Sequence, residues 1–228
     1  MTSAILDTGI YADTLRTYGY DIIPTERIEA FRSYEQHHAD MQTLIVDDTA
    51  FVLSTCRTLQ NTLHGRYRVI ECGENISQDY PHNIALNALY INHTLIGHLP
   101  YIDRKITIFC QINGDQFIDV QQGYTRCACA IAGDNALITA DRGIYRTLIG
   151  ERGLDILLIS EGSITLTGAD YGFIGGASGY DRHRLYFCGN IAAHPDYDRI
   201  TEFCKKHGTE IISLGCNTLT DIGGILFC

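Results

Sequence analysis

The chain has 228 residues, of which 45% are apolar and 19% charged, as is typical of one globular domain spanning residues 1–228. The net charge of −10 argues against a nucleic-acid surface, because phosphate contacts need clustered Lys and Arg. No apolar run approaches the roughly 20 residues of a membrane span. The N-terminus also lacks the pattern of a signal peptide, so we expect a cytoplasmic protein without a membrane partner.

The first predicted element is a helix that leads into a strand, and its pattern recurs. Segment 7–23, DTGIYADTLRTYGYDII, starts with Asp, carries Gly twelve residues later, and then becomes apolar. Segments 141–157 and 196–212 follow the same plan, as does segment 54–72. An Asp before a helix and a Gly after it are typical helix boundaries. Segment 97–110 looks like a shorter version, and its end, KITIFC, is expected to be a strand.

Five further stretches lie between these helix–strand segments. Each opens with a polar residue, alternates small and apolar positions, turns at Asp, Asn or Gly, and returns as an apolar strand. Aligning the five stretches gives steps of 43, 44, 43 and 51 residues between equivalent polar positions: Asp40, Asn83, Cys127, Asp170 and Asp221. The sequence therefore predicts a ββαβ unit of about 43 residues in five copies.

The predicted copies divide the whole chain, and the last copy is split between its two ends. Their expected bounds are about 38–79, 80–122, 123–166, 167–215, and 216–228 together with 1–24. The fifth copy stops at Cys228, after its second expected strand. Residues 7–23 then supply the missing helix and third strand, which predicts an α/β ring of five units. The alternative is that short helix–Gly–strand echoes arise by chance in an ordinary α/β protein.

Such a ring resembles the pentein fold, or α/β-propeller, of the guanidino-group-modifying enzymes, among them arginine deiminases, dimethylarginine hydrolases and amidinotransferases. TGADYGFIGG (167–176) is similar to the Glu-Gly-Gly-Asp stretch of these enzymes, and TDIGGILFC (220–228) to their last Gly-rich segment followed by Cys. HADMQ, YPHNIALN, QGYTRC and DYGFIGGASG resemble a bacterial branch of the superfamily without an assigned function. The ribosome-binding translation initiation factor six shares the fold.

The resemblance implies a cysteine-dependent reaction on a guanidinium group. In those enzymes a Cys thiolate attacks the guanidinium carbon, carboxylates bind its nitrogens, and a His protonates the departing amine. The chain departs from the pattern, because Thr167 replaces the Glu and Ala169 the second Gly. Cys228 fits the order of Gly-Gly followed by Cys, but a terminal residue makes a poor preorganised nucleophile. His194 precedes a predicted helix outside the ring centre, so it does not take the catalytic role.

The equivalent positions of the units give the candidate site, because in a ring they converge on the axis. His38 would share a strand face with Asp40, and Asn87 with Asn83. The predicted catalytic residues are Cys127 and His38, with Cys228 as second candidate nucleophile. The predicted cation-binding residues are Asp40, Asn83, Asn87, Asp170 and Asp221.

Each of these residues has a plainer interpretation. Cys127 could be a small buried hydrophobic residue, His38 a turn residue, and the aspartates caps or turn residues at strand ends. Nine cysteines without a secretory signal indicate free thiols. No Cys-x-x-Cys pair occurs, so we expect neither a metal nor a cofactor.

The sequence thus predicts a protein that binds a small cationic guanidino or amidino compound in an acidic centre. As an enzyme it would be a thiol-dependent hydrolase or amidinotransferase. The alternative is a non-catalytic pentein that binds a ligand or a protein. Substrate identity and oligomeric state stay open at this point.

Overall fold

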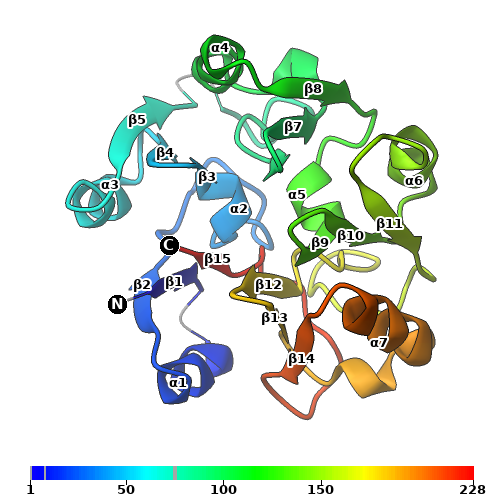
Figure 1. The fold of residues 1–228 in the computed structure, drawn as a ribbon. Helices are drawn as coiled ribbons and strands as arrows, with labels where there is room; N and C mark the ends of the chain where they lie inside the picture. Colours follow the sequence, from blue (N-terminus) through cyan, green and yellow to red (C-terminus); the bar gives the residue numbers. More distant parts are fainter. Residues whose placement is uncertain (1, 8, 74–75) are drawn as a thin grey trace.

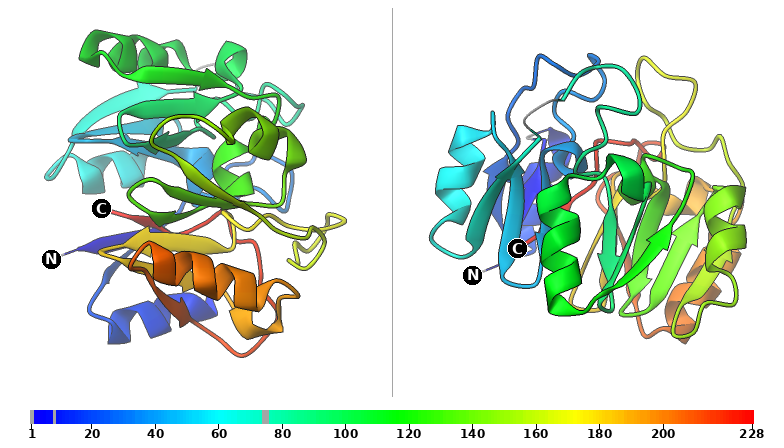
Figure 2. Two further views of the ribbon diagram at one scale, coloured as in Figure 1. Left: turned by 45° about the vertical axis from the view of Figure 1, so that its right-hand side comes forward. Right: turned by 90° about the horizontal axis from the view of Figure 1, so that it is seen from above.

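The computed structural model describes residues 2–7, 9–73 and 76–228 and contains five three-stranded sheets. In every sheet the first pair of strands is antiparallel and the second pair is parallel. The five sheets are arranged around a common centre (Figure 1). Five helices lie at the periphery: α1 (Ile10–Thr17), α3 (Arg57–Leu63), α4 (Arg104–Asn113), α6 (Arg142–Leu148) and α7 (Tyr197–Lys206). Two further views show these five helices on the outside of the sheets (Figure 2). The repeated connectivity agrees with five ββαβ units.

Four units are continuous in the chain. The first comprises α2 (Ala39–Gln42), β3 (Thr43–Val46), β4 (Thr49–Leu53), α3 (Arg57–Leu63) and β5 (Arg68–Cys72). The second comprises β6 (Leu89–Ile91), β7 (Thr94–Gly97), the 3-10 helix η1 (Leu99–Tyr101), α4 (Arg104–Asn113) and β8 (Gln116–Asp119). The third comprises α5 (Thr125–Ala128), β9 (Cys129–Gly133), β10 (Ala136–Thr139), α6 (Arg142–Leu148) and β11 (Asp155–Leu158). The fourth comprises β12 (Ser178–Asp181), β13 (Arg184–Phe187), the 3-10 helix η2 (Ile191–Ala193), α7 (Tyr197–Lys206) and β14 (Glu210–Ser213).

The fifth sheet combines both ends of the chain, in the order β15 (Leu226–Phe227), β1 (Ser3–Leu6) and β2 (Asp21–Pro24), with α1 (Ile10–Thr17) between β1 and β2. The prediction that segment 216–228 contains two strands is wrong, since it contains β15 alone and the middle strand comes from the N-terminus. Gly223 and Gly224 have φ of 77° and 76°. Two successive residues in this left-handed region cannot continue an extended strand, which explains the difference.

The recurrent glycine of the sequence pattern follows a helix in three units. Gly19, Gly153 and Gly208 have φ of 88°, 88° and 67°. Glycine adopts this region without a steric penalty and is therefore common just after a helix. The repeated Asp-to-Gly spacing thus reflects the geometry of the turn into the third strand of these three units.

The expectation of a strand at KITIFC, within 97–110, is also wrong, because these residues belong to α4. The side chain of Asp103 accepts a hydrogen bond from the Lys105 N–H, and Gly114 ends the helix in a left-handed conformation. Ile106 and Cys110, one turn apart, are both fully buried. The caps and this spacing outweigh the strand preference of the β-branched residues.

The hydrophobic core is divided into four clusters of buried side chains, each shared by neighbouring units. One cluster combines Ala4 and Leu6 of the fifth sheet with Tyr186 and Ile212 of the fourth. The units are therefore held together chiefly by apolar contacts between neighbours.

Among the described residues, no helix has both the length and the apolar character needed to cross a bilayer.

Deleting residues 1–24 tests the pairing of the two chain ends. The deletion removes β1, whose residues Ala4, Ile5 and Leu6 have no exposed surface, and leaves β15 without a partner. Burying one large aliphatic side chain is worth about 1.5–3 kcal/mol, so we expect the truncated protein to lose its cooperative thermal transition in calorimetry.

A circular permutant provides the matched control. Ser3 and Cys228 exchange backbone hydrogen bonds of 2.7 and 2.9 Å, so a short linker can join the ends, with new termini placed between Asp134 and Asn135. This permutant keeps every strand and should melt cooperatively. A deletion variant that melts as the full chain does would contradict the role given to β1.

Candidate functional site

A cavity of about 230 Å³ opens beside Cys127 and is lined by three segments of the chain and by Asp221. The segments, which all precede innermost strands of sheets, lie within residues 32–38, 124–127 and 166–173. We call this space the Cys127 cavity. It collects residues from four of the five units, so its composition depends on the arrangement of the sheets.

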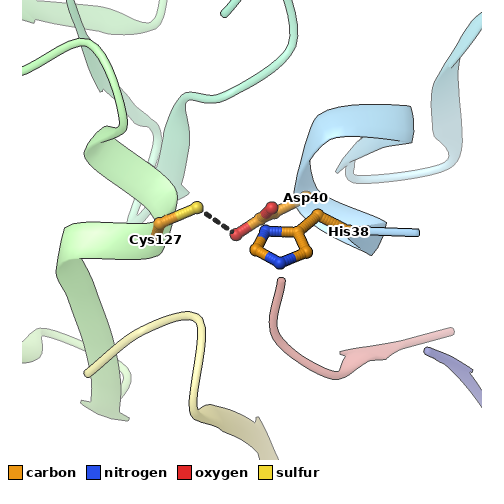
Figure 3. A group of neighbouring side chains, drawn as sticks. All are labelled: His38, Asp40 and Cys127. Atoms are coloured by element: carbon orange, nitrogen blue, oxygen red, sulfur yellow. Dashed lines mark hydrogen bonds between the residues drawn. The ribbon is translucent and has the colours of Figure 1, made fainter. Parts of the chain in front are cut away.

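Cys127 and Asp40 face each other beneath this cavity. Each lies on a one-turn helix that leads into an innermost strand, Cys127 on α5 and Asp40 on α2. The Cys127 thiol donates a hydrogen bond of 2.7 Å to Oδ2 of Asp40 (Figure 3). Cys127 is 2% exposed and Asp40 is fully buried, so this pair is isolated from bulk water.

Asn87 holds the thiol from the other side. Its Nδ2 donates to the Cys127 sulfur at 3.2 Å, and its Oδ1 accepts the Arg126 N–H at 2.9 Å. Because the amide is engaged at both ends, its orientation is fixed. Asn87 therefore positions both α5 and the thiol that α5 carries.

His38 completes a compact group of polar side chains. It is the residue before α2 and is 6% exposed. Its ring nitrogen, an Asp40 oxygen and the Cys127 sulfur lie within 4.8 Å of one another (Figure 3). This set of N, O and S atoms could hold a metal ion such as Zn²⁺, although the sequence predicts none. A thiol, an imidazole and a carboxylate are also the groups that a thiol-dependent reaction would use.

Asp221 is held by backbone donors at the wall of the cavity. Its Oδ2 accepts the Phe173 N–H and its Oδ1 accepts the Gly223 N–H, both at 2.9 Å. A Cβ added at Gly176 would lie 2.0 Å from Oδ1, so only glycine allows this approach. The Gly-rich stretch around residue 176 is thus needed to make room for the carboxylate.

Burial and the neighbouring charges shift the pKa values of Asp40 and Cys127. Burial raises the pKa of Asp40 from 3.8 to about 6, an effect that His38 opposes and that Asp221 reinforces. Burial, followed by the charges of Asp40 and Asp221, raises the pKa of the Cys127 thiol well above its usual range. The thiol therefore keeps its proton and donates a hydrogen bond to Asp40.

Glu35 and Tyr124 belong to the site but were not among the predicted residues. Glu35 is 4% exposed, and its Oε1 accepts the Tyr124 hydroxyl proton at 2.8 Å. Asn83 donates to Tyr124 at 2.6 Å and to Glu35 at 3.2 Å, whereas its own Oδ1 is buried without a partner. Each missed residue stands three positions before a selected one, Glu35 before His38 and Tyr124 before Cys127. That proximity is the only sequence signal they carry.

The predicted cation-binding residues occupy three kinds of position. Asp40, Asp221 and Asn87 surround Cys127, and Asn83 lies next to Glu35. Asp170 lines the cavity but is exposed at its mouth. The aligned positions are not equivalent relative to the strands, because Asp40 lies three residues before β3 (from Thr43) and Asp170 eight before β12 (from Ser178).

The structure does not bring Cys228, the second candidate nucleophile, together with His38, Asp40 and Cys127. Cys228 does not line the Cys127 cavity, and its backbone extends the pairing of β15 with Ser3. Burial raises the pKa of its thiol, which Arg66 opposes. Gly223 and Gly224 form the turn that follows Asp221, and the chain then enters β15. The Cys that follows the two glycines therefore lies at the end of a strand.

The comparisons with known proteins give one family and several structural relatives. The model of the Family of unknown function (DUF6873) matches residues 7–226. No curated protein matches the chain in sequence. A dimethylarginine dimethylaminohydrolase variant, solved as an adduct with S-methyl-L-thiocitrulline, is similar with a TM-score of 0.56 and 11% identity, over 93% of this chain and 91% of that one.

Two more solved structures are similar at the same level. A variant of the dimethylarginine dimethylaminohydrolase from Pseudomonas aeruginosa, in complex with citrulline, has a TM-score of 0.51 and 12% identity, over 93% of this chain and 90% of that one. An amidinotransferase of saxitoxin biosynthesis from Microseira wollei has a TM-score of 0.52 and 8% identity, over 90% and 75%. At such identities the likeness concerns the fold. The chain therefore belongs to the Family of unknown function (DUF6873) and has the fold of the pentein superfamily.

Proposed function

We propose that the Cys127 cavity binds a small guanidino or amidino cation and that Cys127 attacks its central carbon. One observation carries the proposal: a buried thiol, an imidazole and a carboxylate lie within 4.8 Å of one another beside a cavity with further carboxylates. The solved relatives act on, or are bound to, compounds of related chemistry, which supports the choice of ligand.

The walls of the cavity suit a planar cation. Tyr124 and Phe173 are stacked with ring centroids 6.2 Å apart, and Tyr171 meets Phe173 edge-on at 6.1 Å. Aromatic faces attract cations, and carboxylates bind the paired N–H groups of a guanidinium. Glu35 and Asp221 provide such carboxylates within the same cavity. Apolar faces with acidic oxygens between them favour a guanidinium over a neutral ligand.

The cation itself would activate the nucleophile. Without ligand, the negative charges of Asp40 and Asp221 help to keep the thiol protonated. A bound guanidinium compensates these charges and lowers the pKa of Cys127, so the thiolate forms only when the substrate is present. Asp40 then accepts the thiol proton through the existing hydrogen bond.

The reaction would proceed through a covalent intermediate. The Cys127 sulfur forms a bond to the guanidinium carbon, and the bond from that carbon to one nitrogen breaks. The departing amine takes a proton from the His38 imidazolium. Water, in a hydrolase, or a second amine, in a transferase, then adds to the carbon. The bond from the carbon to the Cys127 sulfur breaks, the thiolate is regenerated, and a ureido or a new amidino product is released.

A non-catalytic binding protein is the second candidate function. The raised pKa of Cys127 and its hydrogen bonds to Asp40 and Asn87 also suit a structural thiol at the floor of a ligand site. The two functions share the cation and differ in whether the thiol reacts.

We also infer that the five units form a closed ring. The pairing of β15 with β1 supports this, because it joins the last segment of the chain to the first.

Arginine, agmatine and N-methylated arginines distinguish the two functions. We expect at least one of them to raise the melting temperature of both the native protein and Cys127→Ser by mass action. A ureido or amidino-transfer product, detected by mass spectrometry, should form only with the native thiol. Binding without product in either protein would favour the non-catalytic candidate. If no guanidino compound stabilises the protein, the proposed function is wrong.

Alkylation of the thiols gives an independent measure of where the cation binds. Iodoacetamide should modify Cys127 slowly, because its pKa is raised, and more slowly still when a guanidino ligand is bound above it. Cys216 is exposed and serves as the internal control, whose labelling rate should not change. Equal labelling of Cys127 with and without every ligand tested would contradict the location of the site.

Replacing Asp40 by Asn should change how stability depends on pH. The pKa of Asp40 is about 6 in the folded protein against an ordinary value of 3.8, so the folded state binds the proton more tightly than the unfolded chain. Stability therefore falls as pH rises from about 4 to about 6 and stays lower above that range. A difference of about two pKa units corresponds to about 3 kcal/mol.

Denaturant unfolding across this range measures the effect. We expect the free energy of unfolding of Asp40→Asn not to fall between about pH 4 and pH 6. Above pH 6 it should exceed that of the native protein by up to about 3 kcal/mol. The guanidino ligand should no longer stabilise this variant. Asp198→Asn makes the same chemical change at an exposed helix position and should follow the native curve. An Asp40→Asn protein that is less stable than the native one at pH 7 would contradict this account.

A further inference from the structure

A second cavity, of about 180 Å³, lies where the innermost strands of all five sheets meet. We call it the central cavity. It shares no lining residue with the Cys127 cavity. Its walls are mostly apolar and come from β3, β6, β9, β12 and β15, with Leu44, Leu89, Ile131 and Leu226 among them.

Arg126 is the one charged residue among the described residues that line the central cavity. It precedes Cys127 on α5, is 7% exposed, and sends its side chain along β9, where Nη1 donates to the Cys129 carbonyl oxygen at 3.3 Å. A Cβ at Gly224 would lie 3.8 Å from Nη2, which places the guanidinium next to β15. The charge thus sits at the centre of the fold.

The guanidinium lacks an anionic partner. Within residues 2–7, 9–73 and 76–228, no carboxylate forms an ion pair with Arg126, and Nε and Nη2 donate no hydrogen bond. Asp40 acts on it only through space, because the Asp40 carboxylate accepts from Cys127 instead. A guanidinium stays charged at physiological pH, and a buried charge without a partner is costly.

We propose that the central cavity is an anion-binding site in which the Arg126 guanidinium holds a small carboxylate or a halide. Nε and Nη2 form the side edge of the guanidinium, whose two parallel N–H groups match the two oxygens of a carboxylate. The cavity has room for several water molecules, and so for a carboxylate with a short chain. The apolar strand residues then contact the chain, while the charge is paired at Arg126.

This site is separate from the proposed function of the Cys127 cavity. An anion that is complementary to Arg126 is repelled by Asp40 and Asp221, and a guanidino cation is repelled by Arg126. The two ligands therefore cannot exchange places. Binding in the central cavity can be measured whether or not Cys127 is reactive.

Propionate and chloride are the probes, with propionamide as the neutral analogue of propionate. Thermal unfolding of the full chain at increasing probe concentration should show a rising melting temperature with propionate or chloride and no rise with propionamide. A larger rise with propionate than with chloride indicates a carboxylate ligand, and the reverse indicates a halide. Equal effects of propionate and propionamide would overturn the proposal, because the charge would then contribute nothing.

Substitution of Arg126 locates the effect. Arg126→Met should raise the dissociation constant for the anion about tenfold or more. Arg126→Lys keeps the charge but lacks the two parallel N–H groups, so it should retain chloride better than propionate. Arg152→Met removes an exposed arginine and controls for net charge and general salt effects. An unchanged anion response in Arg126→Met would overturn the proposal.

A crystal of the unaltered protein grown or soaked in bromide covers the case in which Arg126→Met fails to fold. We expect an anomalous peak beside the Arg126 guanidinium, inside the central cavity. Anomalous peaks confined to other surfaces would contradict the site.

Discussion

The structure depends on the contact between two one-turn helices, α2 and α5, at the centre of the five sheets. Each helix ends where an innermost strand begins, so the positions of these strands fix the distance between the helices. The contact brings the Asp40 carboxylate against the Cys127 thiol at 2.7 Å in a region without bulk water. Burial makes each of the two groups respond strongly to any charge nearby. The chemistry of the site thus follows from the geometry of the repeat.

The buried positive and negative charges are separated along the centre of the fold, whereas Arg32, which also lines the Cys127 cavity, is exposed. Asp40 and Asp221 lie on the side of the Cys127 cavity, whereas the Arg126 guanidinium faces the central cavity. Successive residues of one short helix, Arg126 and Cys127, therefore serve opposite sides. Asn87 supports this division, since its amide oxygen binds the backbone of α5 and its amide nitrogen binds the thiol. A cation on one side and an anion on the other would both reduce unpaired buried charge.

The sequence contains the repeat but only part of its geometry. The Asp-to-Gly spacing is visible because Gly19, Gly153 and Gly208 share a left-handed turn, which few other residues adopt. KITIFC resembles a strand because its β-branched residues mask a helix that depends on its caps at Asp103 and Gly114. The middle strand of the fifth sheet, Ser3–Leu6, is only four residues long and pairs across the whole length of the chain. No local pattern carries such a pairing.

The site shows the same division between local and long-range information. Cys127, Asp40 and Asp221 could be selected because each occupies a recurrent polar position ahead of a strand. Glu35 and Tyr124 could not, because a loop residue reveals its burial only when the partner loop is in place. The alignment of the repeats places Asp170 too close to the centre of the site. The loop before β12 is longer than the corresponding segments, so Asp170 lies at the exposed mouth of the cavity. Spacing along the chain identifies equivalent strands better than equivalent side chains.

The proposed reaction requires that a bound guanidinium converts the Cys127 thiol into a thiolate. Ultraviolet absorbance of the thiolate, taken as the difference between the native protein and Cys127→Ala and followed over a pH titration, tests it most directly. We predict that thiolate absorbance appears at neutral pH only when a guanidino ligand is bound, and that the ligand-free thiol titrates well above its usual range. A titration curve of Cys127 that is the same with and without a bound ligand would contradict the account.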